Sequence, residues 1–302
     1  MLPFTHSVES NHNVLTVRID ISKLKNKEQW FLLRSDAHWD NPDSKQDLIR
    51  NHLDEALKRN AGILDFGDFF CAMQGKYDKR SDKSKVRPEH QDGDYLDKLV
   101  KTAAQWHSKY NDNWIFQLTG NHETAILKHH ETSLLERWSE AMSWASGNVG
   151  HKIPILGYSG WCRFIFMERN KTISCIHLWG IHGYGGGGPV TKDMIQRQRQ
   201  LAYIENADIM VSGHTHDSFV TKDSRVKLSQ KGFVEHKQTY YVKLPSYKDE
   251  YKTGKGGWHI ETGKPPKPNG AMWLRFFPVS KKRNSNDKKF DKAIDFEFIE
   301  AK

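Results

Sequence analysis

Short apolar runs alternate with amphipathic segments along the first two thirds of the chain. Runs of strand length lie at 30–35, 61–70, 113–120, 172–183 and 207–213. Apolar residues recur at helical spacing from about 44 to 61, then over 94–110, 131–146 and 190–205. In the first of these segments Gly62 is expected to end the helix. Short strands that alternate with helices favour an α/β core.

The pattern changes after residue 217. Two strands are expected at 239–246 and 271–279, with no helix between them, and they suggest a second sheet packed on the first. A long loop rich in Gly, Pro and Lys is expected at about 247–270, where Trp258 is a candidate for stacking on a base. An irregular basic insertion is expected at about 74–93. We predict a single domain over residues 1–302.

Composition narrows the partners. Lys and Arg number 46 and Asp and Glu 37, so the net charge is +9, and mean hydropathy is −0.76. The surplus favours anionic, phosphate-rich partners such as DNA or RNA, although solubility alone explains it as well. No run approaches the ~18 apolar residues of a membrane span, and the N-terminus lacks signal-peptide features. We therefore expect a cytoplasmic protein with no membrane contact; the sequence indicates no oligomeric state.

Polar residues that suit metal binding follow the predicted strands at their exits. They are Asp36 and His38, Asp68, Asn121 and His122, His182, and His214 and His216. In an open α/β sheet the carboxyl ends of the strands share one edge, so these side chains should converge. His177 is a competing candidate to His182, but within an apolar strand it is better explained as a packed histidine.

The chemistry of these residues fits a pair of divalent ions. Asp36 and His38 are two residues apart and would lie on one side of an extended segment. His214 and His216 could hold one ion or serve two. Two ions ~3.5–4 Å apart need a bridging carboxylate, which Asp68 could provide. Imidazole with carboxylate suits Mn, Fe or Zn. The glycines before Asp68, Asn121 and His214 would allow sharp turns and leave room.

These residues together resemble a known family. Asp36-x-His38, Gly67-Asp68, Gly120-Asn121-His122-Glu123, His182-Gly183 and Gly213-His214-Thr215-His216 match the five motifs of calcineurin-like metallophosphoesterases. They come in the family's order and span residues 36–216, and five ordered motifs are far more specific than one. The resemblance implies a two-sheet β-sandwich flanked by helices, in four layers α/β/β/α.

The resemblance also implies how the residues divide. One ion would lie among Asp36, His38, Asp68 and His216, and the other among Asp68, Asn121, His182 and His214. The metals would be Mn first, with Fe, Zn, Ni or Co as alternatives, and they would activate water for in-line attack on phosphorus. His122 matches a residue that is not a ligand, and that either protonates the leaving oxygen or stabilises the transition state.

The departures from the family are informative. The protein Ser/Thr phosphatase branch carries Gly-Asp-x-x-Asp-Arg-Gly, in which the second Asp orients the catalytic histidine and the Arg holds phosphate. Here Cys71 and Ala72 stand in those positions. What orients His122 is therefore open. Asp40 could bond to a ligand histidine or face solvent, and Asp65 is expected to cap its turn. The run 185–188 could be a phosphate cradle or a flexible loop, and the loop is favoured.

The function favoured by these residues is hydrolysis of a phosphoester by two metal ions, with a phosphodiester in nucleic acid or a nucleotide as substrate. A protein or small-molecule phosphomonoester phosphatase is the alternative within the enzymes. A binding module that kept the fold without the chemistry is the alternative outside them, and the completeness of the ligand set argues against it. Fold and motifs do not choose the substrate.

Overall fold

The computed structural model describes residues 2–9, 13–74, 81–230, 232–251, 258–261, 263–282 and 290–302. The predicted basic insertion at 74–93 and the predicted loop at 247–270 therefore lie partly outside the described residues. The side chain of Trp258, the stacking candidate, lies outside them too. That the chain forms one domain stays a prediction.

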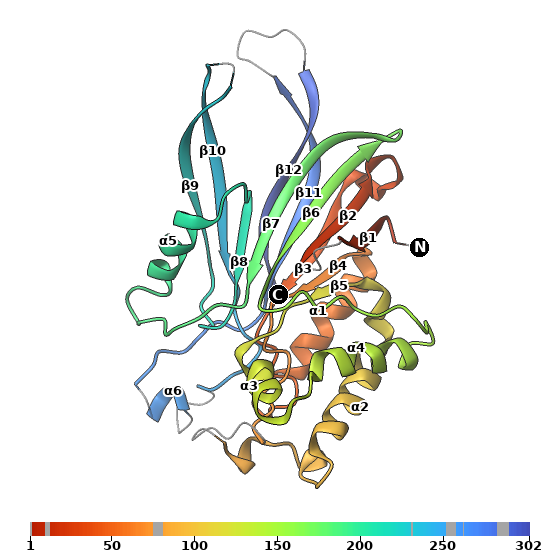
Figure 1. The fold of residues 1–302 in the computed structure, drawn as a ribbon, viewed down its shortest axis with the longest axis vertical. Helices are drawn as coiled ribbons and strands as arrows, with labels where there is room; N and C mark the ends of the chain where they lie inside the picture. Colours follow the sequence, from red (N-terminus) through yellow and green to blue (C-terminus); the bar gives the residue numbers. More distant parts are fainter. Residues whose placement is uncertain are drawn as a thin grey trace.

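Two mixed β-sheets form the centre of the molecule (Figure 1). In the first sheet the strand order is β12-β11-β3-β4-β5, and β3, β4 and β5 run parallel. Its strands are β3 (Gln29–Arg34), β4 (Gly62–Asp65), β5 (Trp114–Gln117), β11 (Ala271–Lys282) and β12 (Phe290–Ala301). The predicted α/β class is thus confirmed.

The second sheet has seven strands in the order β1-β2-β6-β7-β8-β10-β9. They are β1 (Phe4–Val8), β2 (Val14–Asp20), β6 (Ser159–Glu168), β7 (Lys171–Ile181), β8 (Ile209–Ser212), β9 (Phe219–Leu228) and β10 (Val234–Lys243). Strand β8 pairs in parallel with β7 on one side and with β10 on the other.

Helices cover the outer faces of both sheets. Helices α1, α2 and α4 lie on the five-stranded sheet, and α5 lies beside the seven-stranded one (Figure 1). The helices are α1 (Gln46–Arg59), α2 (Tyr95–His107), α3 (Asn121–His130), α4 (Leu134–Ala145), α5 (Met194–Tyr203) and α6 (Trp258–Glu261). Short 3-10 turns occupy Ile21–Lys23, Lys25–Lys27, Lys83–Lys85, Pro88–His90 and Ser108–Asn113.

The side-chain pattern explains the four layers. Successive residues of β3 point to opposite faces, so Phe31 and Leu33 pack between the sheets while Leu32 packs under the helices. All three are fully buried, which is why the strand reads as one continuous apolar run. On the far side Leu201 of α5 packs against Met210 and Tyr241. The layer order is therefore α/β/β/α, as expected.

Four expectations about the elements were wrong. A short helix, α6, lies between the strands expected at 239–246 and 271–279, where no helix was predicted. Helix α1 ends at Asn60, which adopts the left-handed conformation, whereas Gly62 already belongs to β4. The strands near the C-terminus form no sheet of their own: β10 joins the seven-stranded sheet, and β11 lies beside β3. Helix α3 is absent from the sequence-based expectation, because its apolar stripe is weak and Asn121 and His122 in its first turn are typical of a loop.

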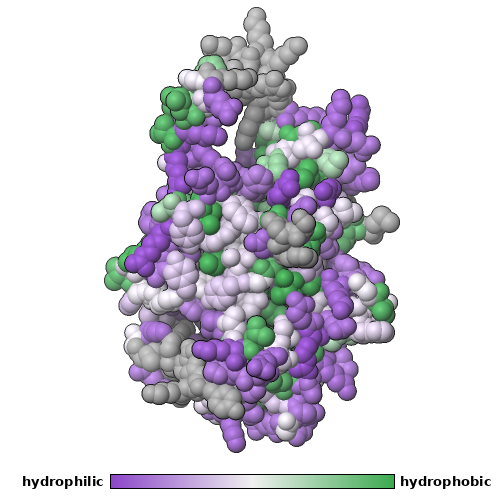
Figure 2. Space-filling view, viewed as in Figure 1, coloured by the Kyte–Doolittle hydropathy of each residue, from purple (hydrophilic) through white to green (hydrophobic). Residues whose placement is uncertain are grey.

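The surface is strongly polar (Figure 2), in keeping with the mean hydropathy of −0.76. An exposed apolar group lies at the end of the β9–β10 hairpin: Leu228 pairs with Val234, and Val226 and Phe233 lie nearby on the same hairpin. None of the helices in the described part of the chain combines the length and apolarity needed to cross a bilayer. A cytoplasmic location stays a prediction.

Candidate metal centre

The predicted site residues lie in five loops at one edge of the two sheets. Asp36 and His38 follow β3, Asp68 follows β4, and Asn121 follows β5 at the first position of α3. The other two loops belong to the seven-stranded sheet, where His182 follows β7 and both histidines of the 213–216 motif follow β8. The edge where the residues meet is thus formed by two sheets and not by one.

The structure brings the predicted ligands together in two groups, and a third group joins His38 and His122 to Cys71. Ligand atoms of Asp36, His38 and His216 lie within 4.8 Å of one another, and so do those of Asp68, His182 and His214. Asn121 belongs with the second group, because its Oδ1 lies 3.2 Å from His182 Nε2 and 2.9 Å from His214 Nδ1. This division matches the one that the motif resemblance implies. That Asp68 bridges two ions stays a prediction.

Buried polar atoms at the centre of the first group indicate that it would accept a cation. Asp36 is fully buried, and its Oδ1 lies 3.3 Å from His216 Nε2 but makes no well-formed hydrogen bond to a described residue. His38 is 2% exposed, and both of its ring nitrogens are equally without a hydrogen bond in the described part of the chain. Because unsatisfied buried polar atoms are costly, a carboxylate and an imidazole left in this state fit a metal ion between them.

In the second group, carbonyl oxygens fix which ring nitrogen faces the centre. His182 donates from Nδ1 to the carbonyl of Phe66 (2.8 Å), and His214 donates from Nε2 to the carbonyl of Gly185 (2.9 Å). His214 Nδ1 then directs its lone pair at Asn121 Oδ1, which is itself an acceptor, and His182 Nε2 does the same once it has lost its proton. The two ring nitrogens and the amide oxygen of Asn121 thus point at one another. A cation site has this arrangement, with the hydrogen bonds to the Phe66 and Gly185 carbonyls orienting the two rings.

Electrostatics keep most of these groups in the state that binds metal. Burial raises the pKa of Asp68, but nearby His122 and His182 outweigh it and hold that pKa well below its usual range. Burial holds the pKa of His38 well below its usual range, with a contribution from His122. Burial likewise lowers the pKa of His214. His182 differs: burial would lower its pKa, but Asp68 raises it to about 9, so a metal ion would displace its proton.

The backbone of these loops is unusual. Asp36, His38, Asp68, His214 and His216 all have positive φ, between 42° and 75°. Left-handed backbone is uncommon for residues with a side chain and clusters at functional sites. The expectation that Asp36 and His38 lie along an extended segment is therefore wrong, since both residues are in tight left-handed turns.

Two glycines leave room for this geometry, as predicted. A Cβ on Gly213 would lie 1.9 Å from Ser35 Oγ and 2.5 Å from Asp36 Oδ2. A Cβ on Gly120 would lie 2.1 Å from Asp68 Oδ1. All three distances are far shorter than real contacts, so each glycine allows a neighbouring loop to approach an aspartate directly.

Glu123 also supports the site, although the sequence places it only within a motif and gives it no role. Its carboxylate is buried and accepts from the backbone N–H of Phe70 (2.8 Å) and of Gly120 (2.9 Å). Burial, together with the charge of Asp68, raises its pKa to about 8. One side chain thus ties the loop after β4 to the start of α3. The signal in the sequence is its place three residues after Gly120, where a capping-box carboxylate belongs.

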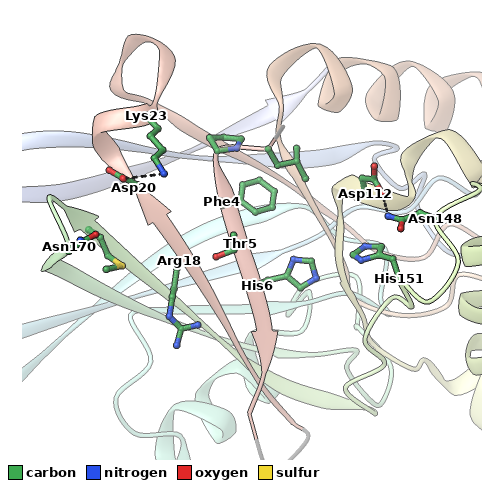
Figure 3. Close-up of a pocket in the computed structure, with 13 residues that line it drawn as sticks. Phe4, Thr5, His6, Arg18, Asp20, Lys23, Asp112, Asn148, His151 and Asn170 are labelled. Atoms are coloured by element: carbon green, nitrogen blue, oxygen red, sulfur yellow. Dashed lines mark hydrogen bonds and ion pairs between the residues drawn. The ribbon is translucent and has the colours of Figure 1, made fainter.

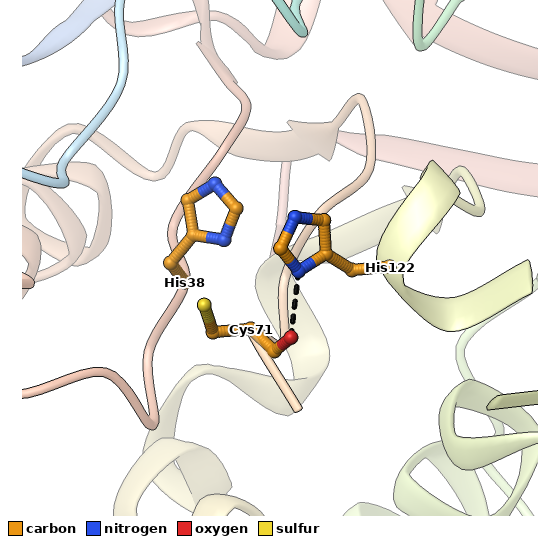
Figure 4. A group of neighbouring side chains, drawn as sticks. All are labelled: His38, Cys71 and His122. Atoms are coloured by element: carbon orange, nitrogen blue, oxygen red, sulfur yellow. Dashed lines mark hydrogen bonds between the residues drawn. The ribbon is translucent and has the colours of Figure 1, made fainter. Parts of the chain in front are cut away.

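The orientation of His122 has a structural answer. Its Nδ1 donates to the backbone carbonyl of Cys71 (2.6 Å), so Nε2 faces the site, 3.8 Å from Asp68 Oδ2 (Figure 4). Asp40 is buried and accepts from the backbone N–H of Cys71 (2.5 Å) and of Ala72 (2.9 Å). Asp40 therefore neither contacts a ligand histidine nor faces solvent. It holds the turn whose carbonyl positions His122.

Asp65, His177 and residues 185–188 lie close to the ligand loops in the sequence but outside the two ligand groups. Asp65 caps its turn as predicted, because its Oδ1 accepts from the N–H of Gly67 (3.1 Å). His177 lies inside β7, where its ring contacts Cys175 Sγ (3.2 Å) and not the two ligand groups. Residues 185–188 form a loop, and the carbonyl of Gly185 serves as the partner of His214.

Two cavities bear on the choice of site. One of about 810 Å³ is lined by His38, Asp68, Asn121, His122, His214 and His216, together with several lysines. The other, of about 720 Å³, lies beside β1 and β2 and is lined by His6, Arg18 and His151 among others (Figure 3). It contains none of the predicted site residues, so the first cavity is the candidate substrate cleft.

Comparisons with known proteins add little at the level of sequence. No protein-family profile matches the chain, and no curated protein does. Among solved structures, a conserved uncharacterized protein from Streptococcus pneumoniae, described as a predicted phosphoesterase, is 11% identical with a TM-score of 0.31. The match covers 89% of this chain and 98% of that one.

A putative 5'-nucleotidase from Staphylococcus aureus, solved with alpha-ketoglutarate, is 13% identical with a TM-score of 0.38. It is covered over 54% of its length, and this chain over 90%. At this level of identity and TM-score, nothing about the site residues of those proteins carries over to this chain.

Proposed function

We propose that this protein is a metal-dependent phosphoesterase that uses two divalent ions to hydrolyse a phosphodiester. The observation that carries the proposal is the pair of ligand groups, Asp36/His38/His216 and Asp68/His182/His214, side by side at the mouth of one cleft. Seven ligands of mixed carboxylate, amide and imidazole type suit Mn, with Fe, Zn, Ni or Co as alternatives.

The ligands have separate roles in this proposal. Asp36, His38 and His216 would hold one ion, Asn121, His182 and His214 the other, and Asp68 would contact both. When bound, two such ions supply a water-derived nucleophile at neutral pH and neutralise charge on the phosphoryl oxygens. The carbonyls of Phe66 and Gly185 hold His182 and His214 in the tautomers that ligation needs.

His122 would act on the substrate and not on the metal. The Cys71 carbonyl accepts a hydrogen bond from Nδ1–H, so a second proton, destined for the leaving oxygen, would be carried on Nε2. The ring lies against that of His38, with centroids 4.7 Å apart, which places it directly beside the first ligand group. A protonated Nε2 would donate its proton to the leaving alkoxide as the bond to phosphorus breaks.

A phosphodiester is preferred over a phosphomonoester because of the cleft's charge. Lysines line it, but so do Asp82, Glu250 and Glu261. A phosphodiester carries one negative charge where a phosphomonoester carries close to two at neutral pH, and this mixed lining suits the smaller charge. The basic surplus of the chain additionally favours DNA or RNA over a small diester.

The test combines metal content with substrate class. The protein is stripped with chelator, reloaded with Mn, Fe, Zn, Ni or Co, and analysed for bound metal. It is then assayed on an aryl phosphodiester, an aryl phosphomonoester, DNA and RNA. We expect about two ions per chain, loss of hydrolysis on stripping, and recovery with Mn. Full hydrolysis by the stripped protein would contradict the proposal. A preference for the monoester would favour the phosphatase, and metal binding without hydrolysis of any ester would favour a binding module.

A further inference from the structure

The wall of the candidate cleft contains a lysine that is largely withdrawn from solvent. Lys248 lines the cleft together with His38, His122 and His216, and its side chain is only 11% exposed. A lysine rarely lies at such a position unless it is paired or has a ligand, because removing an ammonium group from water is costly. Lys248 is paired with Glu250, whose Oε1 lies 2.5 Å from Nζ.

The backbone that carries Lys248 is fixed to the ligand loop itself. The carbonyl of Asp36 accepts from the N–H of Tyr247 (3.1 Å) and from Ser246 Oγ (2.9 Å). The N–H of Lys248 donates to Ser246 Oγ (2.9 Å), and its carbonyl accepts from Asn269 Nδ2 (3.2 Å). The position of Lys248 relative to Asp36 is therefore set by direct hydrogen bonds, as a precise site requires.

The ammonium group has the charge and the donors to hold an anion. Burial lowers the pKa of Lys248, but Cys71 and Glu250 outweigh it, so the pKa is raised and the side chain stays a cation. It lines the cleft together with His38 and His216, two residues of the first ligand group. An ammonium has three donors, so the bond to Glu250 leaves others for a ligand.

Two other lysines of the cleft are paired as Lys248 is, Lys267 with Asp217 (2.7 Å) and Lys85 with Asp43 (2.5 Å). Lys248 differs from these two because its segment is bonded to the Asp36 carbonyl through Ser246 and Tyr247. Cys71, Ala72 and Met73, which follow Asp68 on the same loop, carry no positive charge.

We propose that Lys248 is the phosphate-binding residue of this cleft, its ammonium contacting a non-bridging oxygen of the phosphoryl group while Glu250 holds the side chain in place. The inference rests on the proposed function, because it names the residue that grips the substrate of that same site. It assigns to residue 248, far along the chain from the ligand motifs, a part in substrate binding.

The test measures binding of inorganic phosphate to the manganese-loaded protein by calorimetry, with no turnover required. Replacing Lys248 with Met removes the charge but keeps most of the stem, and should weaken phosphate binding by roughly 10- to 100-fold, as for the loss of a hydrogen bond to a charged group. Lys248→Arg should retain most of the affinity because it keeps the charge. Manganese content should stay at the wild-type value in both variants. The melting temperature shows that each variant is folded, and it should fall for Lys248→Met because the pair with Glu250 is removed.

The matched control is Lys45→Met. Lys45 pairs with Asp249 (2.9 Å) on the neighbouring backbone but does not line the cleft, so phosphate affinity should not change. Equal affinity in Lys248→Met and wild type would overturn the inference, and so would an equal loss in Lys45→Met. If the Met variant does not fold, Lys248→Gln, which is polar and of similar length, is measured in its place.

The two proposals fail in different ways. A protein that binds phosphate through Lys248 but hydrolyses no ester would refute the proposed enzyme and support the phosphate site. A protein that hydrolyses esters while Lys248→Met binds phosphate normally would support the enzyme and refute the role of Lys248.

Discussion

Asp68 and His122 lie next to each other yet have opposite tasks in the proposed site. The carboxylate of Asp68 is 3.2 Å from His182 Nε2 and also accepts from the backbone N–H of His122. The ring of His122, in contrast, is bonded to a carbonyl at Nδ1 and lies at the cleft surface. The first is placed to hold metal and the second to reach the substrate.

Asp68→Ala should therefore lose bound metal, whereas His122→Ala should keep it and lose hydrolysis rate by ~10²–10⁴ if it is a general acid. Elemental analysis of both variants, with rates on an aryl phosphodiester, separates the two effects. His177→Ala removes a histidine outside the ligand groups and should change neither quantity. A metal-free His122→Ala protein would mean that His122 is itself a ligand.

Gly213 tests how closely the loops must approach. Gly213→Ala places a methyl group against Ser35 and Asp36, so the 213–216 loop must move and metal affinity should fall. Gly186→Ala is the control from the neighbouring loop, because no atom lies within 4 Å of its added Cβ. Metal titration of the two variants measures the difference. Equal affinities would show that the loop tolerates the displacement.

At the level of elements, the carboxyl ends of three parallel strands are joined beneath the metal edge. Arg34 ends β3 and Asp65 ends β4, and their side chains form a fully buried ion pair of 2.8 Å. Gln117, the last residue of β5, donates to Asp65 Oδ1 (2.9 Å). The guanidinium group also lies over the rings of Trp114 and Tyr247.

Asp65→Ala leaves the Arg34 charge buried and unpaired, and should lower the free energy of unfolding by about 3–5 kcal/mol. The double variant Arg34→Met/Asp65→Leu should lose less, since it leaves no charge behind. Glu140→Ala breaks an exposed pair with Lys152 and should cost less than about 1 kcal/mol. Urea unfolding curves compare the variants. A cost for Asp65→Ala as small as for Glu140→Ala would contradict this account.

At the scale of the whole molecule, the net charge of +9 could contribute to nucleic-acid binding only through basic side chains that are not already paired within the protein. Part of the basic insertion is already engaged: Lys85 pairs with Asp43, and Arg87 donates to the carbonyl of Asn41 (3.0 Å). Lys83 is exposed, while Lys79 and Arg80 lie outside the described residues. The insertion's free charge is therefore smaller than its composition suggests.

If the insertion grips nucleic acid, replacing Lys79, Arg80 and Lys83 with Ala should weaken DNA binding. It should also flatten the salt dependence by ~0.9 in log–log slope for each phosphate that is no longer neutralised. Hydrolysis of a small aryl phosphodiester should barely change, because that substrate is too short to reach the insertion. Binding measured across a salt series decides this. Unchanged DNA affinity and slope would assign the insertion to a solvated surface.

What the sequence could determine was the set of residues at strand exits. Buried strands read as short apolar runs, and a polar residue directly after such a run has to lie at a sheet edge, so Asp36, Asp68 and His182 could be placed from periodicity alone. The convergence of all eight predicted residues at one edge is as expected. Their assignment as metal ligands stays a prediction, and so does the substrate.

Only the tertiary structure decided how the loops are held. The carbonyl of Cys71 orients His122, Asp40 fixes that carbonyl, and Lys248 reaches the site from a segment that lies outside all five motifs. The sharing of the site between two sheets, and the addition of β10 and β11 to different sheets, were equally out of reach. The spacing of apolar residues along the sequence predicts which face of a helix or strand is buried. It does not predict which distant backbone groups meet at that face, because those contacts depend on the packing of the whole chain.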